Sequence, residues 1–423
     1  MTTAPSGDAP AHESDSRIFR VRAFRLLFII RCASMMSYQM IGVVVGWQIY
    51  DLTESAMALG LIGLVQLTPS ICFTLLSGEI ADRFDRRIVV RCSYAIQTGV
   101  TIGLIGLTLV PHPPVAAFYV LLFCNALART FEGPSLQSLL PSLVPTSILS
   151  RAIAAYSSST RMATLLGPSV GGVIYAFGVI TDYTCCLVLM AIAMTTSFLL
   201  PPPAARTSAR AKMTWTSMSA GVKYIWGNSL LFSAISLDLL ATFFGGMTAL
   251  LPIFARDILD IGPWGLGILR SSPAVGALLM SAVLSRFPVT RSAGYVILGG
   301  AAVYALGSIF FALSHIFLLS VFFLFFVGAG DTISQVNRKT LMQIMTPNHV
   351  LGRVTAVNSL STTIGNQLGQ FESGVTAAWF GAMGSVVFGG VSVLLIVAIW
   401  AWRYPELRRI ERADSVGLIP ESP

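Results

Sequence analysis

Residues 78–87 read GEIADRFDRR, a short and highly charged stretch between two long apolar runs. The runs cover residues 57–80 and 88–110, and each exceeds the roughly 20 residues that a helix needs to cross a bilayer. A charged stretch between two such runs predicts a pair of membrane helices joined at the membrane surface.

The same alternation of apolar runs and polar breaks continues along all 423 residues. Hydrophobic residues make up 54% of the chain and charged residues 11%, whereas soluble domains carry about 25% charged residues. We therefore predict an all-α membrane protein with twelve transmembrane helices. Two runs, 152–178 and 354–380, are weakly apolar and would also suit surface helices. The other runs are 24–49, 115–139, 183–200, 230–254, 264–285, 293–313, 315–341 and 384–402.

Basic residues are distributed unevenly between the two sides of the predicted membrane. Twelve spans place both termini on one side, and the segments of that side hold 20 of the 27 lysines and arginines. The loops of the opposite side hold one, Arg256. Because cytoplasmic loops are enriched in basic residues, we predict a multi-pass protein of the cell membrane with both termini in the cytoplasm. The net charge of +8 is then a cytoplasmic collar, and no nucleic-acid partner is expected.

The chain divides into two halves that resemble each other. The predicted organisation is a cytoplasmic tail, a six-helix bundle, a linker, a second six-helix bundle and a second tail, at 1–23, 24–200, 201–229, 230–402 and 403–423. Two parallel pseudo-repeats of this kind place a substrate site between the halves, near the membrane midplane.

The repeat is visible as a shift of 202 residues, with small drifts elsewhere. At 202 the shift superimposes Pro145, Arg151, Gly167 and Gly172 on Pro347, Arg353, Gly369 and Gly374. At 206 it superimposes Asp51 on Asp257, and at 207 Leu59 and Gly60 on Leu266 and Gly267.

The stretch at 78–87 resembles the signature loop of the major facilitator superfamily, G-x-L-A-D-R-x-G-R-R, with Ile80 and Asp85 as departures. The resemblance covers essentially the whole chain and implies a transporter. It also implies a conformational latch, in which Asp82 lies beside the cytoplasmic start of helix eleven. The alternative is that the arginines only anchor the topology. The latch residues are Gly78, Asp82, Arg83, Arg86 and Arg87.

Two further elements narrow the resemblance. Residues 129–133 are similar to the family's R-x-x-Q-G element, with Glu132 in place of Gln. Residues 163–172 resemble the G-x-x-x-G-P-x-x-G-G element of proton-exchanging exporters, with Ala163 at one glycine position. Close helix packing explains the same small residues, which are Gly167, Pro168, Gly171 and Gly172. Residues 46–53 and 345–354 resemble the branch that contains bacterial enterobactin exporters.

Several predicted spans carry charges, each costing about 2.5–3.5 kcal/mol at a helix centre. Arg31 and Asp238 lie at similar depths in spans one and seven, which predicts an ion pair across the cavity. Arg129 lies one turn before Glu132, which predicts a pair within one helix. Burial favours the neutral form of a carboxylic acid, so buried carboxylates suit proton exchange, although each could instead belong to a structural pair. The candidate proton carriers are Asp238, Glu132, Asp331 and Glu372.

These patterns favour a proton-coupled exporter of amphipathic small molecules that works by alternating access as a monomer. A siderophore or other metabolite exporter is the narrower alternative, and a membrane sensor or scaffold that does not transport is a third. No phosphate loop, H-E-x-x-H motif or nucleophile elbow occurs in the sequence. The six cysteines and four histidines lack metal-ligand spacing. No catalytic function, metal or cofactor is expected.

Overall fold

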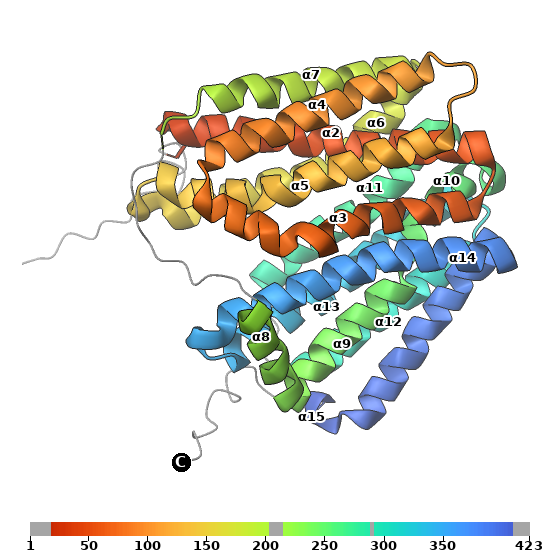
Figure 1. Cartoon of the computed structure of the whole chain (residues 1–423). Helices are drawn as coiled ribbons and strands as arrows, with labels where there is room; N and C mark the ends of the chain where they lie inside the picture. The colour runs from red at the N-terminus through yellow and green to blue at the C-terminus, as the bar shows by residue number, and fades with distance from the viewer. Residues whose placement is uncertain (1–17, 203–214, 288–291, 409–423) are drawn as a thin grey trace, which may run out of the picture.

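The computed structural model describes residues 18–202, 215–287 and 292–408, which form helices and helical turns without any strand (Figure 1). Ten helices in these ranges are long and apolar enough to cross a membrane. One of the ten, α14, contains two spans because Gly381 interrupts it with φ 74°. A further 27-residue helix, α6, falls outside the ten because it carries arginines and many hydroxyl residues. The described chain thus holds the twelve predicted helical crossings.

The first bundle contains six long helices, with a short turn η1 (Thr146–Ile148) before the fifth. They are α2 (Arg22–Thr53), α3 (Ala56–Arg83), α4 (Arg86–Thr108), α5 (Val115–Leu143), α6 (Leu149–Tyr175) and α7 (Val179–Phe198).

The second bundle follows a linker helix, α8 (Trp215–Gly227), which packs against α14. Its elements are α9 (Ser229–Phe244), η2 (Gly246–Ala249), α10 (Leu251–Ile253), η3 (Phe254–Ile258), α11 (Gly262–Arg286), α12 (Ala293–Leu313), α13 (Phe317–Met345), α14 (Asn348–Arg403) and α15 (Pro405–Arg408).

Span seven differs from the continuous helix predicted over 230–254. The α-helix α9 ends at Phe244, and the chain continues through the short turns η2, α10 and η3 to Ile258. Gly245 marks the break, where a Cβ atom would collide with the hydroxyl group of Tyr304. The weak propensity of glycine for helices and this close approach together explain the interruption.

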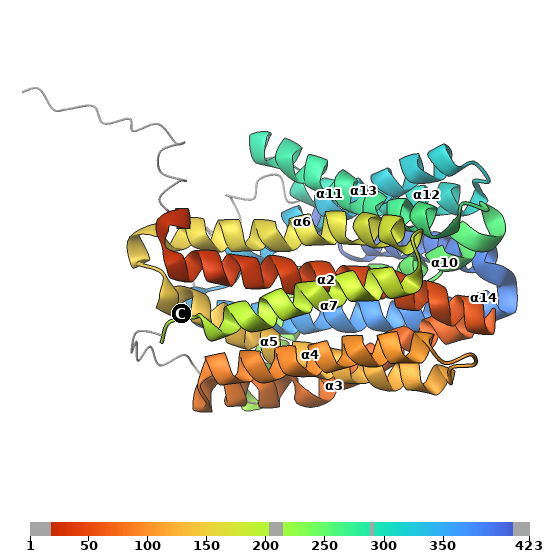
Figure 2. The same cartoon turned by 90° about the horizontal axis from the view of Figure 1, so that it is seen from above.

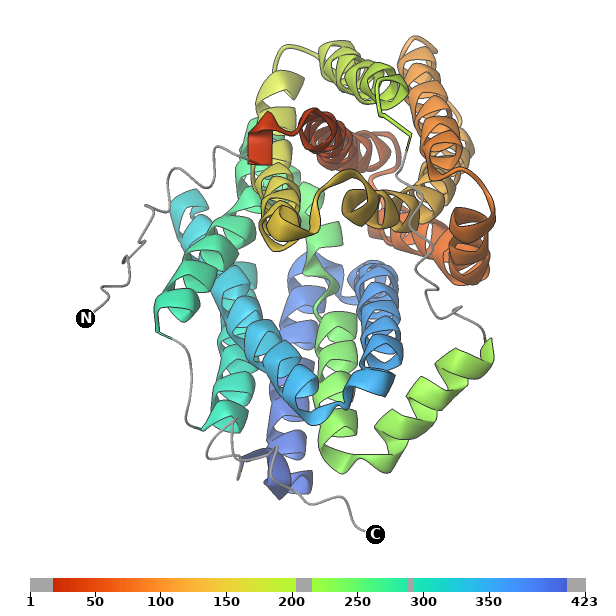
Figure 3. The ribbon, with the colours of Figure 1, turned by 90° about the vertical axis from the view of Figure 1, so that its left-hand side faces the viewer.

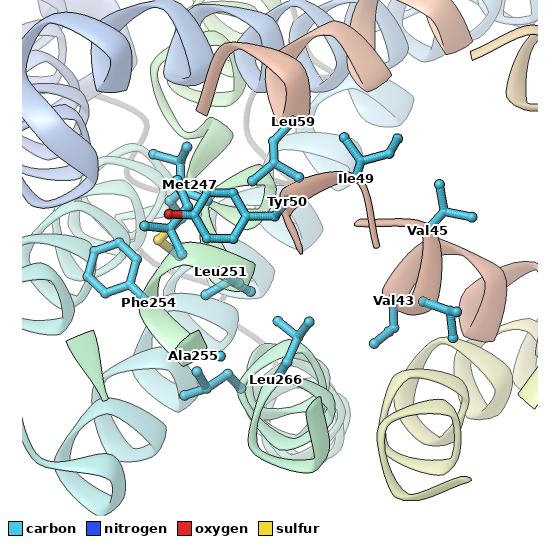
Figure 4. Close-up of a cluster of buried hydrophobic side chains, with 14 of the residues drawn as sticks. Val43, Val45, Ile49, Tyr50, Leu59, Met247, Leu251, Phe254, Ala255 and Leu266 are labelled. Atoms are coloured by element: carbon cyan, nitrogen blue, oxygen red, sulfur yellow. The ribbon is translucent and has the colours of Figure 1, made fainter. Parts of the chain in front are cut away.

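Hydrophobic clusters show that the two bundles share a core at one end of the molecule. We call the end at which α2 begins the tail end, and the end at which α2 finishes the far end. The largest cluster among the described residues joins Val43 and Leu59 to Met247 and Leu266 of the second bundle. Figure 4 shows the Tyr50 ring pointing into this cluster. The remaining clusters each belong to a single bundle, and Figure 3, seen from the tail end, shows the two groups of helices.

Two pairs of glycines bring the bundles into backbone contact near the far end. A Cβ atom on Gly172 would lie 2.8 Å from the Cα atom of Gly267, where α6 packs against α11 (Figure 2). A Cβ atom on Gly374 would lie 2.6 Å from the Cα atom of Gly60, where α14 packs against α3 (Figure 1). We call these two contacts the glycine seams. The four residues are the repeat mates found in the sequence, so the seams are related by the pseudo-twofold axis of the repeat.

Candidate functional site

Glu132 on α5 is a buried carboxylate of the first bundle, and its side chain is 1% exposed. Neutral groups donate hydrogen bonds to it: the hydroxyl groups of Ser34 at 3.3 Å and Tyr94 at 3.2 Å, and the amide of Gln97 at 2.9 Å. The guanidinium groups of Arg31 and Arg129 lie at 3.9 and 3.8 Å, beyond hydrogen-bond distance. Glu132 is thus held mainly by neutral donors, with two cations close by.

The second bundle holds its buried carboxylate, Asp238 on α9, by a closer ion pair. The Arg338 Nη2 atom of α13 lies 2.5 Å from Asp238 Oδ1, and both side chains are at most 5% exposed. Thr362 of α14 donates a hydrogen bond of 2.7 Å to the second carboxylate oxygen. Asp238 therefore has a partner for each of its oxygens.

The two clusters are related by the internal repeat, with their charges exchanged. In the first bundle the cation Arg31 is on the first helix and the carboxylate Glu132 on the fourth. In the second bundle Asp238 is on the first helix and Arg338 on the fourth. The repeat mates Thr160 and Thr362 serve both: the hydroxyl of Thr160 accepts from Arg31 Nε at 3.0 Å, and that of Thr362 donates to Asp238. These threonines are not among the residues predicted from the sequence, although the shift of 202 superimposes them.

The predicted ion pair between Arg31 and Asp238 is wrong in this structure. Each residue pairs within its own bundle, because helices of one bundle are packed together while spans one and seven lie in different bundles. Arg338 is 4% exposed, so its guanidinium lies inside the second bundle. The neighbouring Lys339 is exposed. The pair predicted within α5 is present, with Arg129 Nη1 3.8 Å from Glu132.

A cavity of about 240 Å³ lies beside Asp238 within the second bundle. Asp331, Tyr304 and Asn366 line it together with the Asp238–Arg338 pair. The amide of Gln335 donates a 3.0 Å hydrogen bond to Asp331. Asp238 and Asp331 therefore meet at one cavity, as two of the four candidate proton carriers.

Glu372 lies apart from both clusters. It is half-buried on α14, and the Ser373 hydroxyl approaches its carboxylate at 3.5 Å. Among the described residues it makes no ion pair. Glu372, a candidate proton carrier, therefore has no ion-pair partner among the described residues, in contrast to Glu132 and Asp238.

The charged stretch at 78–87 forms the end of α3 and the start of α4 rather than a long loop. Asp85, which departs from the family pattern, caps α4 by accepting a 2.9 Å hydrogen bond from the Arg87 backbone. The Arg87 side chain hydrogen-bonds the same carboxylate and holds the pKa of Asp85 below its ordinary value. Arg86 reaches the Ser138 carbonyl oxygen of α5 at 3.2 Å.

The other latch residues have simpler surroundings. Gly78 has open space where a Cβ would lie, and Arg83 pairs with Glu79 at 2.6 Å on the exposed surface. The Asp82 side chain is outside the described part of the structure, so its contact with helix eleven stays a prediction.

The small residues of α6 lie at helix contacts. A Cβ on Gly167 would be 2.5 Å from the Gln39 Cβ of α2, and one on Gly171 would be 3.1 Å from the Met40 Cα. Gly172 forms a glycine seam with α11, and the Pro168 carbonyl oxygen lies at the same seam. The element thus joins α6 both to its own bundle and to the opposite one.

Polar residues at the far end connect the bundles around one cation. The hydroxyl group of Tyr50 donates to the carboxylate of Asp257. The guanidinium of Arg256 lies 3.3 Å from Asp51 and 3.1 Å from Glu54. The shift of 206 relates Tyr50 to Arg256 and Asp51 to Asp257, so the two contacts are reciprocal across the pseudo-twofold axis. We call this group the far-end clasp.

Removing the cation of the clasp should open the far end more often. The pairs are largely exposed, so each is expected to contribute only about 0.2–1 kcal/mol. In Arg256→Gln, a cysteine placed at the buried Ala255 should react with a small thiol reagent a few-fold faster, in a background without other cysteines. Arg286→Gln, at the exposed tail end of α11, is the control. Unchanged reactivity in Arg256→Gln would show that the clasp does not hold the far end closed.

Comparisons with known proteins agree with this arrangement. The sequence matches the Major Facilitator Superfamily over residues 27–370. An enterobactin exporter of Citrobacter koseri is 26% identical over 404 residues, covering 93% of this chain and 94% of the relative. An enterobactin exporter of Salmonella typhi is 25% identical over 405 residues, covering 93% and 95%.

Solved transporters share the fold at low sequence identity. A bacterial homolog of the human lysosomal transporter Spinster, in an inward-facing and occupied conformation, aligns with TM-score 0.72 and 13% identity, covering 92% of this chain and 97% of that one. A nucleoside transporter aligns with TM-score 0.71 and 13% identity, covering 91% and 100%. Because the family match spans most of the sequence and the fold agrees with these transporters, this multi-pass membrane protein belongs to the major facilitator superfamily.

Proposed function

We propose that this transporter is a secondary active exporter that moves an amphipathic small molecule out of the cell in exchange for protons. The observation that carries the proposal is the likeness to enterobactin exporters over more than nine-tenths of both chains. The buried carboxylates of Glu132 and Asp238 support the exchange of protons, because a scaffold without transport has no use for their insertion cost. Catalysis forms no part of the proposal.

A siderophore is the second candidate substrate, in place of a broad range of amphipathic molecules. The relatives that cover the chain end to end are named for the export of enterobactin. An identity of 25–26% leaves room for a different substrate in the same framework.

The distribution of basic residues supports an assignment of the two ends of the molecule to the two sides of the membrane. If the tail end faces the cytoplasm, the shared core, the glycine seams and the clasp all close the outer side. The separate cores at the tail end then belong to an inward-facing state that receives substrate from the cytoplasm. When the protein changes to the outward-facing state, we propose that Asp82 latches the tail end, as in the family pattern. We further propose that the protein works as a monomer in a bacterial inner membrane.

Inside-out membrane vesicles test the proposed activity. With an acidic lumen, vesicles that contain the protein should accumulate members of a substrate panel that includes enterobactin and other amphipathic molecules. A protonophore should abolish the accumulation, and vesicles without the protein give the background. Uptake that does not depend on the pH gradient would exclude proton coupling. If no molecule of the panel accumulates, the proposed export function is excluded. Accumulation of enterobactin alone would favour the siderophore candidate.

The orientation leads to a separate prediction about two exposed positions. His112 lies between α4 and α5 at the far end, and Pro201 follows α7 at the tail end. In a cysteine-free protein, His112→Cys should react with a membrane-impermeant thiol reagent added to intact cells, whereas Pro201→Cys should react only after the cells are opened. The opposite pattern would reverse the assigned sides of the membrane.

A further inference from the structure

Arg270 is a cation within the membrane helix α11. Among the residues that the structure describes, it makes no ion pair and no hydrogen bond. Its guanidinium crosses to the first bundle, where its Nη1 atom would lie 3.5 Å from a Cβ atom built on Gly42 of α2. Gly42 therefore leaves room for the guanidinium between the bundles, just inside the far-end cluster.

Tyr38 connects Arg270 to a second arginine. It lies one helical turn before Gly42, the residue beside which Arg270 lies, and the guanidinium of Arg129 lies over its ring, 3.8 Å from the centroid. The Arg129 Nη1 atom is buried without any hydrogen-bond partner among the described residues. Glu132 Oε2 lies 3.8 Å from this atom, beyond hydrogen-bond distance. Because a buried donor left unpaired is costly, the Nη1 atom can take a further hydrogen-bond partner.

The charges around Tyr38 do not balance. Arg31 and Arg129 share a single carboxylate, Glu132, at 3.8–3.9 Å. Arg270 adds a third cation, beside Gly42 on the helix that carries Tyr38. Within this group, the three cations Arg31, Arg129 and Arg270 outnumber the single carboxylate of Glu132.

We propose that Arg129, which lies over the Tyr38 ring, and Arg270, which lies beside Gly42 one turn further along α2, bind a planar oxyanion of the transported molecule, such as a carboxylate. Guanidinium groups suit this role because their N–H donors match the geometry of two carboxylate oxygens. The aromatic ring of Tyr38 adds an apolar surface for the rest of an amphipathic anion. This inference rests on the proposed transport function and names the class of substrate for the same central site.

Binding of 2-naphthoate and 2-naphthamide to the purified full-length protein tests the inference, because the two ligands share a shape and differ in charge. Affinities can be taken from the ligand-dependent shift in thermal unfolding. The unaltered protein should bind the naphthoate at least roughly tenfold more tightly, which corresponds to about 1.4 kcal/mol. In Arg270→Gln the ratio should fall to about one, and Arg270→Lys should keep part of the preference because it keeps the charge.

A purely structural Arg270 predicts different results. Arg270→Gln would then lower the unfolding temperature, whereas a site that lacks only its anion predicts an unfolding temperature that is unchanged or higher. Arg286→Gln, on the same helix at the exposed tail end, should change neither quantity. Equal affinities for the two ligands, or a ratio unaffected by Arg270→Gln, would overturn the anion site. The vesicle assay tests transport independently, because it measures the accumulation of amphipathic molecules and not a preference for charge.

Discussion

A single methyl group at a glycine seam should reduce transport at least about fivefold. In Gly172→Ala the new Cβ would lie 2.7 Å from the Pro263 carbonyl oxygen and 2.8 Å from the Gly267 Cα. Both neighbours are backbone atoms, which cannot relieve the overlap by a change of rotamer as a side chain can. Overpacking of this kind costs about 1–3 kcal/mol, and a cost paid only in the far-end-closed state changes the balance of states roughly 5- to 150-fold.

The second seam provides an internal check on this expectation. Gly374→Ala meets Gly60 in the same way, so it should shift the balance in the same direction. The two changes are in separate contacts, so their free-energy effects should add in the double variant. The cysteine at Ala255 should report the opening as faster labelling, and vesicle uptake should report the loss of transport.

Gly99→Ala on α4 is the matched control, since its Cβ would meet no atom within 4 Å. Normal transport by Gly172→Ala and Gly374→Ala would show that the seams open and close without tight backbone contact. Loss of transport without faster labelling at Ala255 would assign the effect to something other than far-end closure.

The four glycines of the seams could be identified from the sequence. The shift of 202 that relates Gly172 to Gly374, and the shift of 207 that relates Gly60 to Gly267, identified four residues that the fold brings into two equivalent contacts. An internal repeat constrains both halves to the same packing, so residues that recur in it tend to lie at equivalent contacts. The helix spans were equally accessible, because bilayer thickness fixes the length of each apolar run.

Pairing of the membrane charges was harder to predict. The position of Arg31 or Asp238 along its helix gives its depth, but the identity of its partner depends on which distant helix packs alongside. Arg338 follows Asp238 by 100 residues and Thr160 follows Arg31 by 129, so no local spacing relates them. The break at Gly245 was missed for a similar reason, since it depends on the approach of Tyr304 from α12.

Removing the charge of Asp238 should lower both the stability of the protein and its transport activity. Asp238→Asn would leave the buried guanidinium of Arg338 without its anion, and breaking a buried pair in this way costs about 3–5 kcal/mol. Glu132→Gln should be milder, because its hydrogen-bond donors are neutral and its two cations lie at 3.8–3.9 Å. The unfolding temperatures of the two purified variants measure this difference.

Glu132→Gln is therefore the cleaner test of proton coupling. A glutamine keeps the shape of the side chain and cannot release a proton. Accumulation driven by a pH gradient should stop in this variant, while counterflow, which needs no net proton movement, should persist. If Glu132→Gln still accumulates substrate under a pH difference alone, Glu132 is not an essential proton carrier.

For Asp238, a double variant separates a structural role from coupling. Asp238→Asn combined with Arg338→Gln removes both charges, so it should recover much of the stability that Asp238→Asn loses, because a neutral replacement of a buried ion pair is often well tolerated. If Asp238 carries protons, the double variant should be stable, active in counterflow and unable to use the pH gradient. If gradient-driven accumulation returns together with stability, the Asp238–Arg338 pair is structural, and proton coupling must lie with Glu132 or Asp331.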